Sequence, residues 1–189
     1  MKISMCITLA CLALLSGCST LNEQECRSVD WYQLGLQDGQ QGKPADLLNE
    51  HKESCKRYGI LPDRSQYLNG RNAGLVEYCQ LGNAFRAGLN GDEYKGVCPL
   101  DVDAEFRRYN AAALEVYNSK KQVEDIDGQI SRKEHELAKE DITEKEKLRL
   151  LEEIRKLDRK RDRLRSDLHY QERELNYLMD KAKYRSGRR

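Results

Sequence analysis

The chain has 189 residues, of which 39% are hydrophobic, 34% charged and 7% aromatic, and it carries 33 Lys and Arg against 32 Asp and Glu. Such a polar composition, with two Phe and one Trp, provides too few large apolar side chains for one large packed core, which argues against an ordinary single-core globular enzyme. The balanced charge also argues against nucleic acid as a partner, because the chain as a whole would not attract a polyanion.

The first residues are typical of a bacterial lipoprotein signal peptide. Lys2 precedes an apolar run over residues 3–15, which is too short to span a bilayer as a helix. The run leads into Leu15-Ser16-Gly17-Cys18, which resembles a lipobox, the motif whose cysteine is lipidated. We therefore expect residues 1–17 to be a cleaved signal peptide; an ordinary secretory signal cleaved at another position is the alternative.

Lipidation of Cys18 would attach the mature chain to a membrane, with residues 18–25 as a short lipid-anchored linker. Ser19 follows this position, and a residue other than Asp there resembles the sorting pattern of lipoproteins exported to the outer membrane. Several acyl chains make such an anchor effectively permanent, since each buried methylene contributes about 0.8 kcal/mol. The sequence thus predicts a lipid-anchored protein of the outer membrane that faces the periplasm.

Besides the lipidated Cys18, four cysteines remain after this processing: Cys26, Cys55, Cys79 and Cys98. An even number in an oxidising compartment predicts two disulfides, and the lack of a Cys-x-x-Cys pair argues against a four-thiolate zinc site. If residues 31–42 and 45–58 form an antiparallel helical pair, their outer ends bring Cys26 towards Cys55 and leave Cys79 for Cys98. Of the three connectivities we prefer this one to Cys26–Cys79 with Cys55–Cys98.

The composition changes near Pro99, which divides the chain into two modules. All three prolines and the four cysteines precede residue 100, whereas the segment after it is rich in charge. We predict a Cys- and Gly-rich helical domain over residues 26–100 and a second module over residues 101–189. The first module is small for a stable core, so each disulfide would stabilise it by about 3 kcal/mol.

Glycines recur at helical spacing in the first module. The pattern Tyr-x-x-Gly-x-x-x-Gly occurs from Tyr32 to Gly39 and again from Tyr67 to Gly74. Glycines four residues apart lie on one face of a helix, where they let another backbone approach closely. The pattern predicts either tight helix–helix packing beside aromatic side chains or a series of turns and caps.

The same segment carries a family resemblance. The residues concerned are Asp30-Trp31-Tyr32, Gly35, Asp38-Gly39, Gly42, His51, Cys55, Pro62-Asp63, Tyr67, Gly70-Arg71, Gly74, Tyr78-Cys79 and Cys98-Pro99. In these aromatics, glycine spacings and cysteines, the chain resembles the domain of unknown function 2799 family of bacterial lipoproteins over about residues 26–99. The resemblance implies a small envelope lipoprotein and brings no established activity or catalytic residue.

The second module contains two hydrophobic seams with alternating three- and four-residue steps, over residues 102–137 and 150–182. Their phase breaks near Thr143-Glu144-Lys145-Glu146, a capping-box signature that begins a new helix. A single antiparallel alignment of the two seams pairs their apolar residues. In this alignment the side chains of the polar seam residues Asp127 and Arg161 lie diagonally opposite each other, close enough to interact. We therefore predict an antiparallel coiled-coil hairpin with its turn near residues 139–143 and a basic C-terminal tail.

The fold class expected from these patterns is mainly α: a small disulfide-stapled helical domain followed by a long antiparallel helical hairpin. The candidates for recognition are aromatic and basic side chains of the first module, although half or more of the aromatics would equally serve its small core. They are Trp31, Tyr32, Tyr67, Arg71 and Tyr78.

Catalytic patterns are weak. His51, with Asp46, Glu50 and Glu53 nearby, is the one histidine of the first module, and we interpret it as surface helix charge rather than as a general base or metal ligand. No phosphate-binding loop, nucleophile elbow or metalloprotease helix occurs in the sequence. The sequence therefore predicts no catalytic residue, no metal site and no cofactor.

The function expected is that of a structural or adaptor binding protein of the cell envelope, whose partner is an envelope protein or peptidoglycan. The alternative is a small envelope hydrolase, or a hydrolase inhibitor, centred on the Cys-rich module with His51 and nearby carboxylates as its acid–base set. Self-association of the hairpins is a third interpretation, because Ile126, Leu148 and Leu151 lie just off the main seam.

Overall fold

A computed structural model describes the backbone of residues 21–186 and the side chains of residues 21–183. The predicted signal peptide over residues 1–17, the lipidation residue Cys18 and the end of the basic tail lie outside the described residues. The described part is mainly α, as expected, and contains no strand. Its seven helices are α1 (Glu23–Ser28), α2 (Trp31–Gln40), α3 (Leu47–Lys56), α4 (Arg64–Tyr78), α5 (Leu81–Leu89), α6 (Leu100–Leu137) and α7 (Glu144–Ser186).

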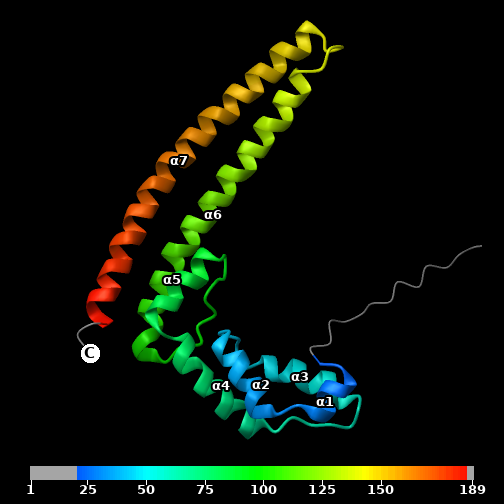
Figure 1. Cartoon of the computed structure of the whole chain (residues 1–189), viewed down its shortest axis with the longest axis vertical. Coiled ribbons are helices and arrows are strands. Elements are labelled where there is room, and N and C mark those ends of the chain that lie inside the picture. The colour runs from blue at the N-terminus through cyan, green and yellow to red at the C-terminus, as the bar shows by residue number, and fades with distance from the viewer. Residues whose placement is uncertain (1–20, 187–189) are drawn as a thin grey trace, which may run out of the picture.

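The helices form a base and a long projection (Figure 1). Helices α1 to α4 make the base, α6 and α7 form a hairpin that extends from it, and α5 lies beside the foot of α6. None of the helices within residues 21–186 is both long enough and apolar enough to cross a bilayer.

Helices α2 and α4 pack tightly through the repeated glycine pattern, as one of the two interpretations predicted. A β-carbon on Gly35 would collide with the Tyr67 carbonyl group, and one on Gly70 would collide with the Tyr32 carbonyl group. One turn further along, a β-carbon on Gly39 would collide with the Arg71 carbonyl group, so residue numbers rise together along both helices and the helices run parallel. The expected antiparallel packing of residues 31–42 on residues 45–58 is therefore wrong, because α3 lacks the glycines that admit a second backbone.

Helix α3 instead packs on α1. The disulfide Cys26–Cys55 joins them, with 5.5 Å between the Cα atoms. Both cysteines form a small buried cluster with Leu21, the first described residue. Half-buried side chains cover this α1–α3 cluster: Trp31, Leu34, Tyr58 and Ile60.

The main hydrophobic core joins the base to the foot of the hairpin. Phe106 of α6 is fully buried and contacts the rings of Tyr78 and Tyr94 at centroid distances of 5.1 and 4.7 Å. Tyr109 of α6 stacks on Phe85 of α5 at 4.7 Å. The division predicted at residue 100 therefore does not separate two hydrophobic cores, because aromatic side chains on both sides of it bury one another. Residues Leu175, Leu178 and Ala182 of α7 and the disulfide Cys79–Cys98 complete this core.

The hairpin continues beyond this core as two packed helices. At a rise of about 1.5 Å per residue, its arms are about 57 and 64 Å long. Helix α6 ends at Leu137, and α7 begins after Thr143, whose Oγ1 accepts a hydrogen bond from the Glu146 backbone N–H at 3.3 Å. Ile126 is 1% exposed within the seam, so it offers no surface for self-association, whereas Leu148 is 67% exposed near the tip.

Candidate functional site

Two of the five side chains predicted to serve recognition are buried, so their prediction as exposed candidates is wrong. Tyr67 is fully buried and Arg71 is 7% exposed. The physical reason is the tight α2–α4 contact, which encloses both side chains within the base. Trp31 and Tyr32 are half-buried at the start of α2, and Tyr78 is half-buried at the end of α4.

Tyr67 belongs to a buried polar network of the base. Its hydroxyl donates to Asp38 Oδ2 at 2.7 Å, and His51 Nε2 lies 3.0 Å from the same oxygen, within hydrogen-bonding distance. Burial, together with the hydrogen bond to Asp38, raises the pKa of Tyr67 well above its usual value, so the phenol is neutral. The network joins α2, α3 and α4 and stabilises their arrangement, since each polar group has a partner.

His51 is a buried residue, and its interpretation as a surface charge is wrong. It is 4% exposed and lies on the inner face of α3 with Leu48 and Cys55, at steps of three and four residues. This spacing was the sequence signal that His51 lies on a buried helix face. The charged residues on the outer face of α3 obscured that signal. Within residues 21–183, no three His, Cys, Asp or Glu side chains gather where they could hold a metal ion.

Arg71 holds the turn that follows α2. Its Nε and Nη2 atoms donate to the Lys43 carbonyl oxygen at 3.0 and 2.7 Å. Gly42 in this turn has φ of 67°, and a β-carbon there would collide with the Tyr78 ring. The turn is therefore pressed onto the end of α4, where it forms one wall of an open cleft.

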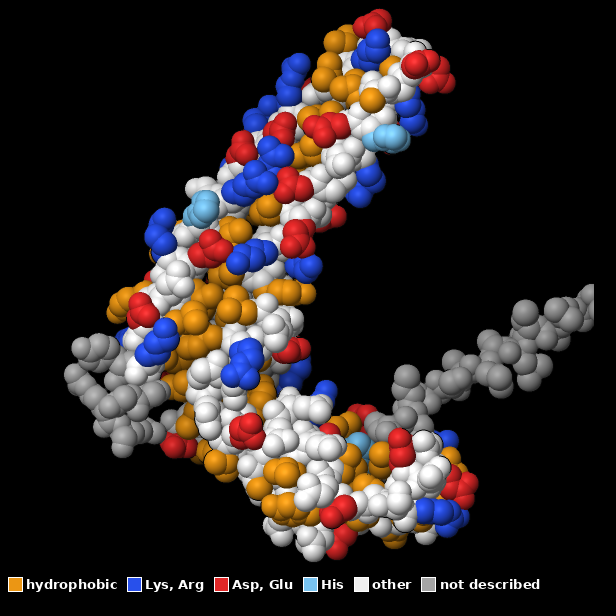
Figure 2. Space-filling view, in the orientation of Figure 1, with side chains coloured by type: hydrophobic (Ala, Val, Ile, Leu, Met, Phe, Trp, Pro, Cys, Tyr) orange, Lys and Arg blue, Asp and Glu red, His pale blue; other side chains and the backbone are white. Residues whose placement is uncertain are grey.

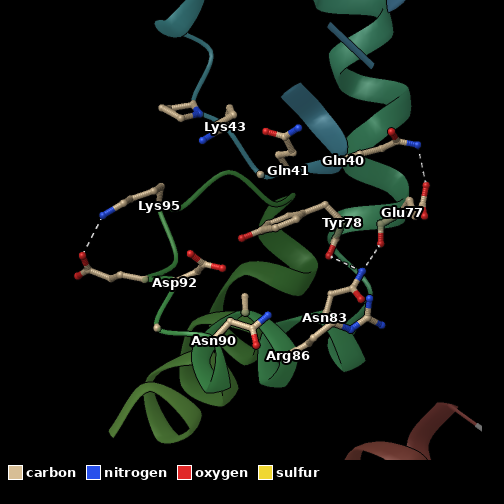
Figure 3. A pocket seen from close by; sticks show the side chains of 15 residues that line it. Gln40, Gln41, Lys43, Glu77, Tyr78, Asn83, Arg86, Asn90, Asp92 and Lys95 are labelled. Atoms are coloured by element: carbon tan, nitrogen blue, oxygen red, sulfur yellow. Dashed lines mark hydrogen bonds and ion pairs between the residues drawn. The ribbon is translucent and has the colours of Figure 1, made fainter. Parts of the chain in front are cut away.

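The cleft lies between the base and the foot of the hairpin and has a volume of about 1050 Å³ (Figure 3). Figure 3 shows Tyr78 extending between its two walls, with the hydroxyl towards the loop that carries Asp92 and Lys95. Of the five predicted recognition residues, Tyr78 is the one that lines it. The lining residues are Gln40, Gln41, Gly42, Lys43, Pro44, Glu77, Tyr78, Asn83, Arg86, Ala87, Asn90, Gly91, Asp92, Glu93 and Lys95.

Asn110 of α6 shapes the second wall of the cleft. Its side chain accepts a hydrogen bond from the Tyr94 backbone N–H at 2.8 Å and donates to the carbonyl oxygens of Asp92 at 2.9 Å and Ala84 at 3.3 Å. Asn110 is 2% exposed, so these bonds satisfy a buried amide. The sequence patterns did not single out Asn110, although an amide beside the aromatic seam position Tyr109 was the available signal.

The cleft presents both charges and several amides. Glu77 accepts a hydrogen bond from Gln40 at 2.9 Å, whereas neither Lys43 nor Arg86 forms an ion pair within the described residues. Burial, with the negative charge of Asp92, raises the pKa of Tyr78, so its hydroxyl is a neutral donor and acceptor. Such a surface suits a polar segment that carries hydrogen-bonding groups and both signs of charge.

Positive and negative side chains lie next to one another on the surface of the hairpin. Figure 2 shows basic and acidic side chains interspersed along both arms. Arg161 lies 3.3 Å from Asp127 and 2.7 Å from Asp158, and Arg165 lies 3.1 Å from Asp127. The diagonal contact between Asp127 and Arg161 is the one expected from the seam. Arg161 and Arg165 of α7 therefore face acidic partners, and acidic side chains interrupt the other basic residues of the helix.

Residues 30–115 match the model of a family described as protein of unknown function (DUF2799). The matched segment begins at residue 30 instead of the expected 26, and it extends past residue 99 to include the foot of α6. This boundary agrees with the main core, to which Phe106, Tyr109 and Ala113 contribute. No curated protein and no solved structure matches the chain.

Proposed function

We propose that this chain, whose residues 30–115 belong to the domain of unknown function 2799 family, is an outer-membrane lipoprotein that acts as a scaffold or adaptor of the cell envelope. In this proposal the lipid on Cys18 holds the protein at the membrane and the base lies beside it. The hairpin then reaches a partner in the periplasm or the cell wall.

The observation that carries the proposal is the core shared by the base and the hairpin. Phe106 of α6 packs against Tyr78 of α4, and the disulfide Cys79–Cys98 crosses the same core. Because packed interiors resist deformation, this shared core fixes the orientation of the hairpin relative to the base. A rigid arm about 60 Å long can span the distance between an anchored base and a partner.

The start of the described chain supports this arrangement. Leu21 is buried in the α1–α3 cluster and follows Cys18 by three residues. Consecutive Cα atoms are about 3.8 Å apart, so a lipid on Cys18 would be held within about 11 Å of Leu21. The hairpin tip lies at the opposite end of the molecule from α1 (Figure 1). An anchor at the base would thus leave the tip free to meet a partner.

The cleft supplies a second contact point in the proposal. Lys43 and Arg86, which form no ion pair within the described residues, and the carboxylate of Asp92 suit a polar segment of an envelope protein or of peptidoglycan, both of which offer amides and both signs of charge. His51 does not line this cleft. Its buried position removes the support that the hydrolase alternative had, because a general base must reach the proton that it abstracts.

Site-specific photocrosslinking in the native host tests the proposal. Photoreactive residues would replace Leu148 near the hairpin tip and Arg86 in the cleft. Val76, which is 75% exposed and lies outside the cleft, is the control position. We expect adducts with a defined envelope protein or with peptidoglycan from Leu148 or Arg86 and none from Val76. The same adducts from all three positions, or none from any, would count against an adaptor.

A shortened hairpin separates the two contact points. Replacing residues 124–160 by a glycine-rich loop removes the distal hairpin and keeps the foot that completes the core. Deletion of residues 101–189 would not serve, since it removes Phe106 and Tyr109 from the core. We expect the shortened chain to lose the adducts formed by the tip. Full retention of partner capture would assign recognition to the cleft.

A further inference from the structure

We propose that the base carries a membrane-docking surface formed by Trp31, Tyr58, Ile60 and Leu61. The inference rests on the proposed lipid anchor and adds that the folded base itself enters the lipid interface. Leu61 would insert among the acyl chains, with Trp31 and Tyr58 at the level of the headgroups.

Local geometry explains why Leu61 points outwards. After α3, Gly59 adopts φ of 73°, and the Ile60 backbone N–H donates to the Cys55 carbonyl oxygen at 3.3 Å. This helix-ending motif brings the residue after the glycine back onto the helix. Ile60 accordingly packs on the α1–α3 cluster, and the next residue, Leu61, is 67% exposed.

The apolar surface is continuous with the point where the chain enters the base. Ile60, Trp31 and Tyr58 cover the cluster that contains Leu21. The disulfide Cys26–Cys55 fixes α1 to α3 and so prevents the entry point from moving away from this surface.

The short distance to the lipid indicates that a membrane is what this surface contacts. Three Cα–Cα steps separate Cys18 from Leu21, so the covalent chain keeps the lipidated residue within about 11 Å of Leu21 in the cluster. A partner protein would have to fit between the surface and the bilayer in that space. Tryptophan and tyrosine are favoured at membrane interfaces because their rings are apolar and their tips are polar. A bilayer surface therefore matches both the distance and the chemistry.

The charged groups around this surface are compatible with headgroups. The Arg57 guanidinium lies 5.7 Å from the centre of the Tyr58 ring, and Lys56 lies 3.8 Å from Glu53. Asp63 accepts hydrogen bonds from the Gln66 backbone N–H and the Ser65 hydroxyl at the start of α4, which lower the pKa of its carboxyl group. The negative charge of Asp63 therefore interacts with the N-terminus of α4. The long basic side chains can extend towards lipid phosphates while their stems stay on the apolar surface.

The only tryptophan of the chain, Trp31, provides a direct probe. The lipidated protein would be reconstituted in phosphatidylethanolamine and phosphatidylglycerol vesicles that contain lipids with a nitroxide in the headgroup or the upper acyl chain. We expect these lipids to quench Trp31 fluorescence in the wild-type protein and Leu61→Asp to lose most of that quenching. Leu148→Asp is the matched control, because Leu148 is also 67% exposed but lies at the far end of the hairpin.

Intact mass of the purified mature chain distinguishes failure of the anchor from failure of the docking surface. A chain without lipid would overturn the proposed anchor and the docking surface with it. A lipidated chain whose Trp31 is unquenched, or is quenched equally in the wild type and in Leu61→Asp, would overturn the docking surface alone. Equal loss of quenching in Leu61→Asp and Leu148→Asp would also overturn it, since the effect would then not be local.

Discussion

Gly39 of α2 lies so close to the Arg71 carbonyl group of α4 that a β-carbon has no room between them. The equivalent contact occurs with the roles reversed, because Gly74 of α4 lies equally close to the Leu36 carbonyl group of α2. The repeated Tyr-x-x-Gly-x-x-x-Gly pattern therefore builds a pair of parallel helices that are related by an approximate two-fold axis. The repeat in the sequence has a physical use, since each copy supplies the glycines that the other copy needs.

The α2–α4 contact predicts that Gly39→Ala will destabilise the base. The added methyl group meets backbone atoms, which cannot rotate away, so we expect the free energy of unfolding to fall by about 2–3 kcal/mol. Gly82→Ala in α5 is the control, because among the described residues no heavy atom beyond its chain neighbours and its own helix backbone lies within 4 Å of its β-carbon position. That change should leave stability unaltered or raise it by about 0.5–1 kcal/mol. Urea unfolding followed by circular dichroism measures both, and equal effects would contradict the tight contact.

His51→Ala should destabilise the protein, because it removes a partner of the buried Asp38 carboxyl group. We expect a loss of about 2–3 kcal/mol in the free energy of unfolding, the usual cost of leaving a buried polar group with fewer partners. His169→Ala is the matched control, since the His169 side chain is 75% exposed on α7. A His51→Ala protein as stable as the His169→Ala protein would show that the buried network contributes little.

The two disulfides should stabilise different parts of the molecule. Cys79 and Cys98, 19 residues apart, cross the main core, and replacing both with alanine should cost about 3 kcal/mol and speed amide exchange in α5 and the foot of α6. Replacing Cys26 and Cys55 should instead release α1 and leave the foot of α6 protected. Hydrogen exchange with mass spectrometry resolves the two regions, and indistinguishable exchange patterns would be inconsistent with this division.

Tyr94 should make stability depend on alkaline pH. Its hydroxyl donates to Asp103 at 2.6 Å and accepts from the Cys98 backbone N–H at 2.8 Å. Burial, followed by the hydrogen bond to Asp103, raises the pKa of Tyr94 to about 12 from the ordinary value of 10.0. Because the folded pKa lies above the unfolded one, this stabilisation is complete below about pH 10 and is lost as the pH rises from about 10 to 12.

Tyr94→Phe tests this dependence. The variant should lose about 1–2 kcal/mol at neutral pH, because the Cys98 N–H loses its acceptor. Its free energy of unfolding should then fall less steeply than that of the wild type above about pH 10. Tyr170→Phe is the control, since Tyr170 is 65% exposed, and should follow the wild type. Parallel pH profiles for the wild type and Tyr94→Phe would refute the assignment.

Features that depend on residues a few positions apart could be predicted from the sequence. The seam spacing and the capping residue Thr143 indicated two helices with a turn between them, and the structure has such a turn between Leu137 and Glu144. The glycine spacing likewise indicated a helix face that admits a second backbone. Helix periodicity and capping are local, so their signals are present in short stretches of sequence.

Outside the hairpin, local spacing did not identify which surfaces meet. It gave no means to tell that the α2 glycines face α4 rather than another helix, or that Phe106 closes the core of the base. For the same reason His51, beside charged neighbours in sequence, was interpreted as exposed, although folding places it against Asp38. The sequence by itself determined the helices, the hairpin and the residue types available. The tertiary structure decided the partners, because burial depends on the shapes of surfaces that are distant in the chain and meet only when the whole core is assembled.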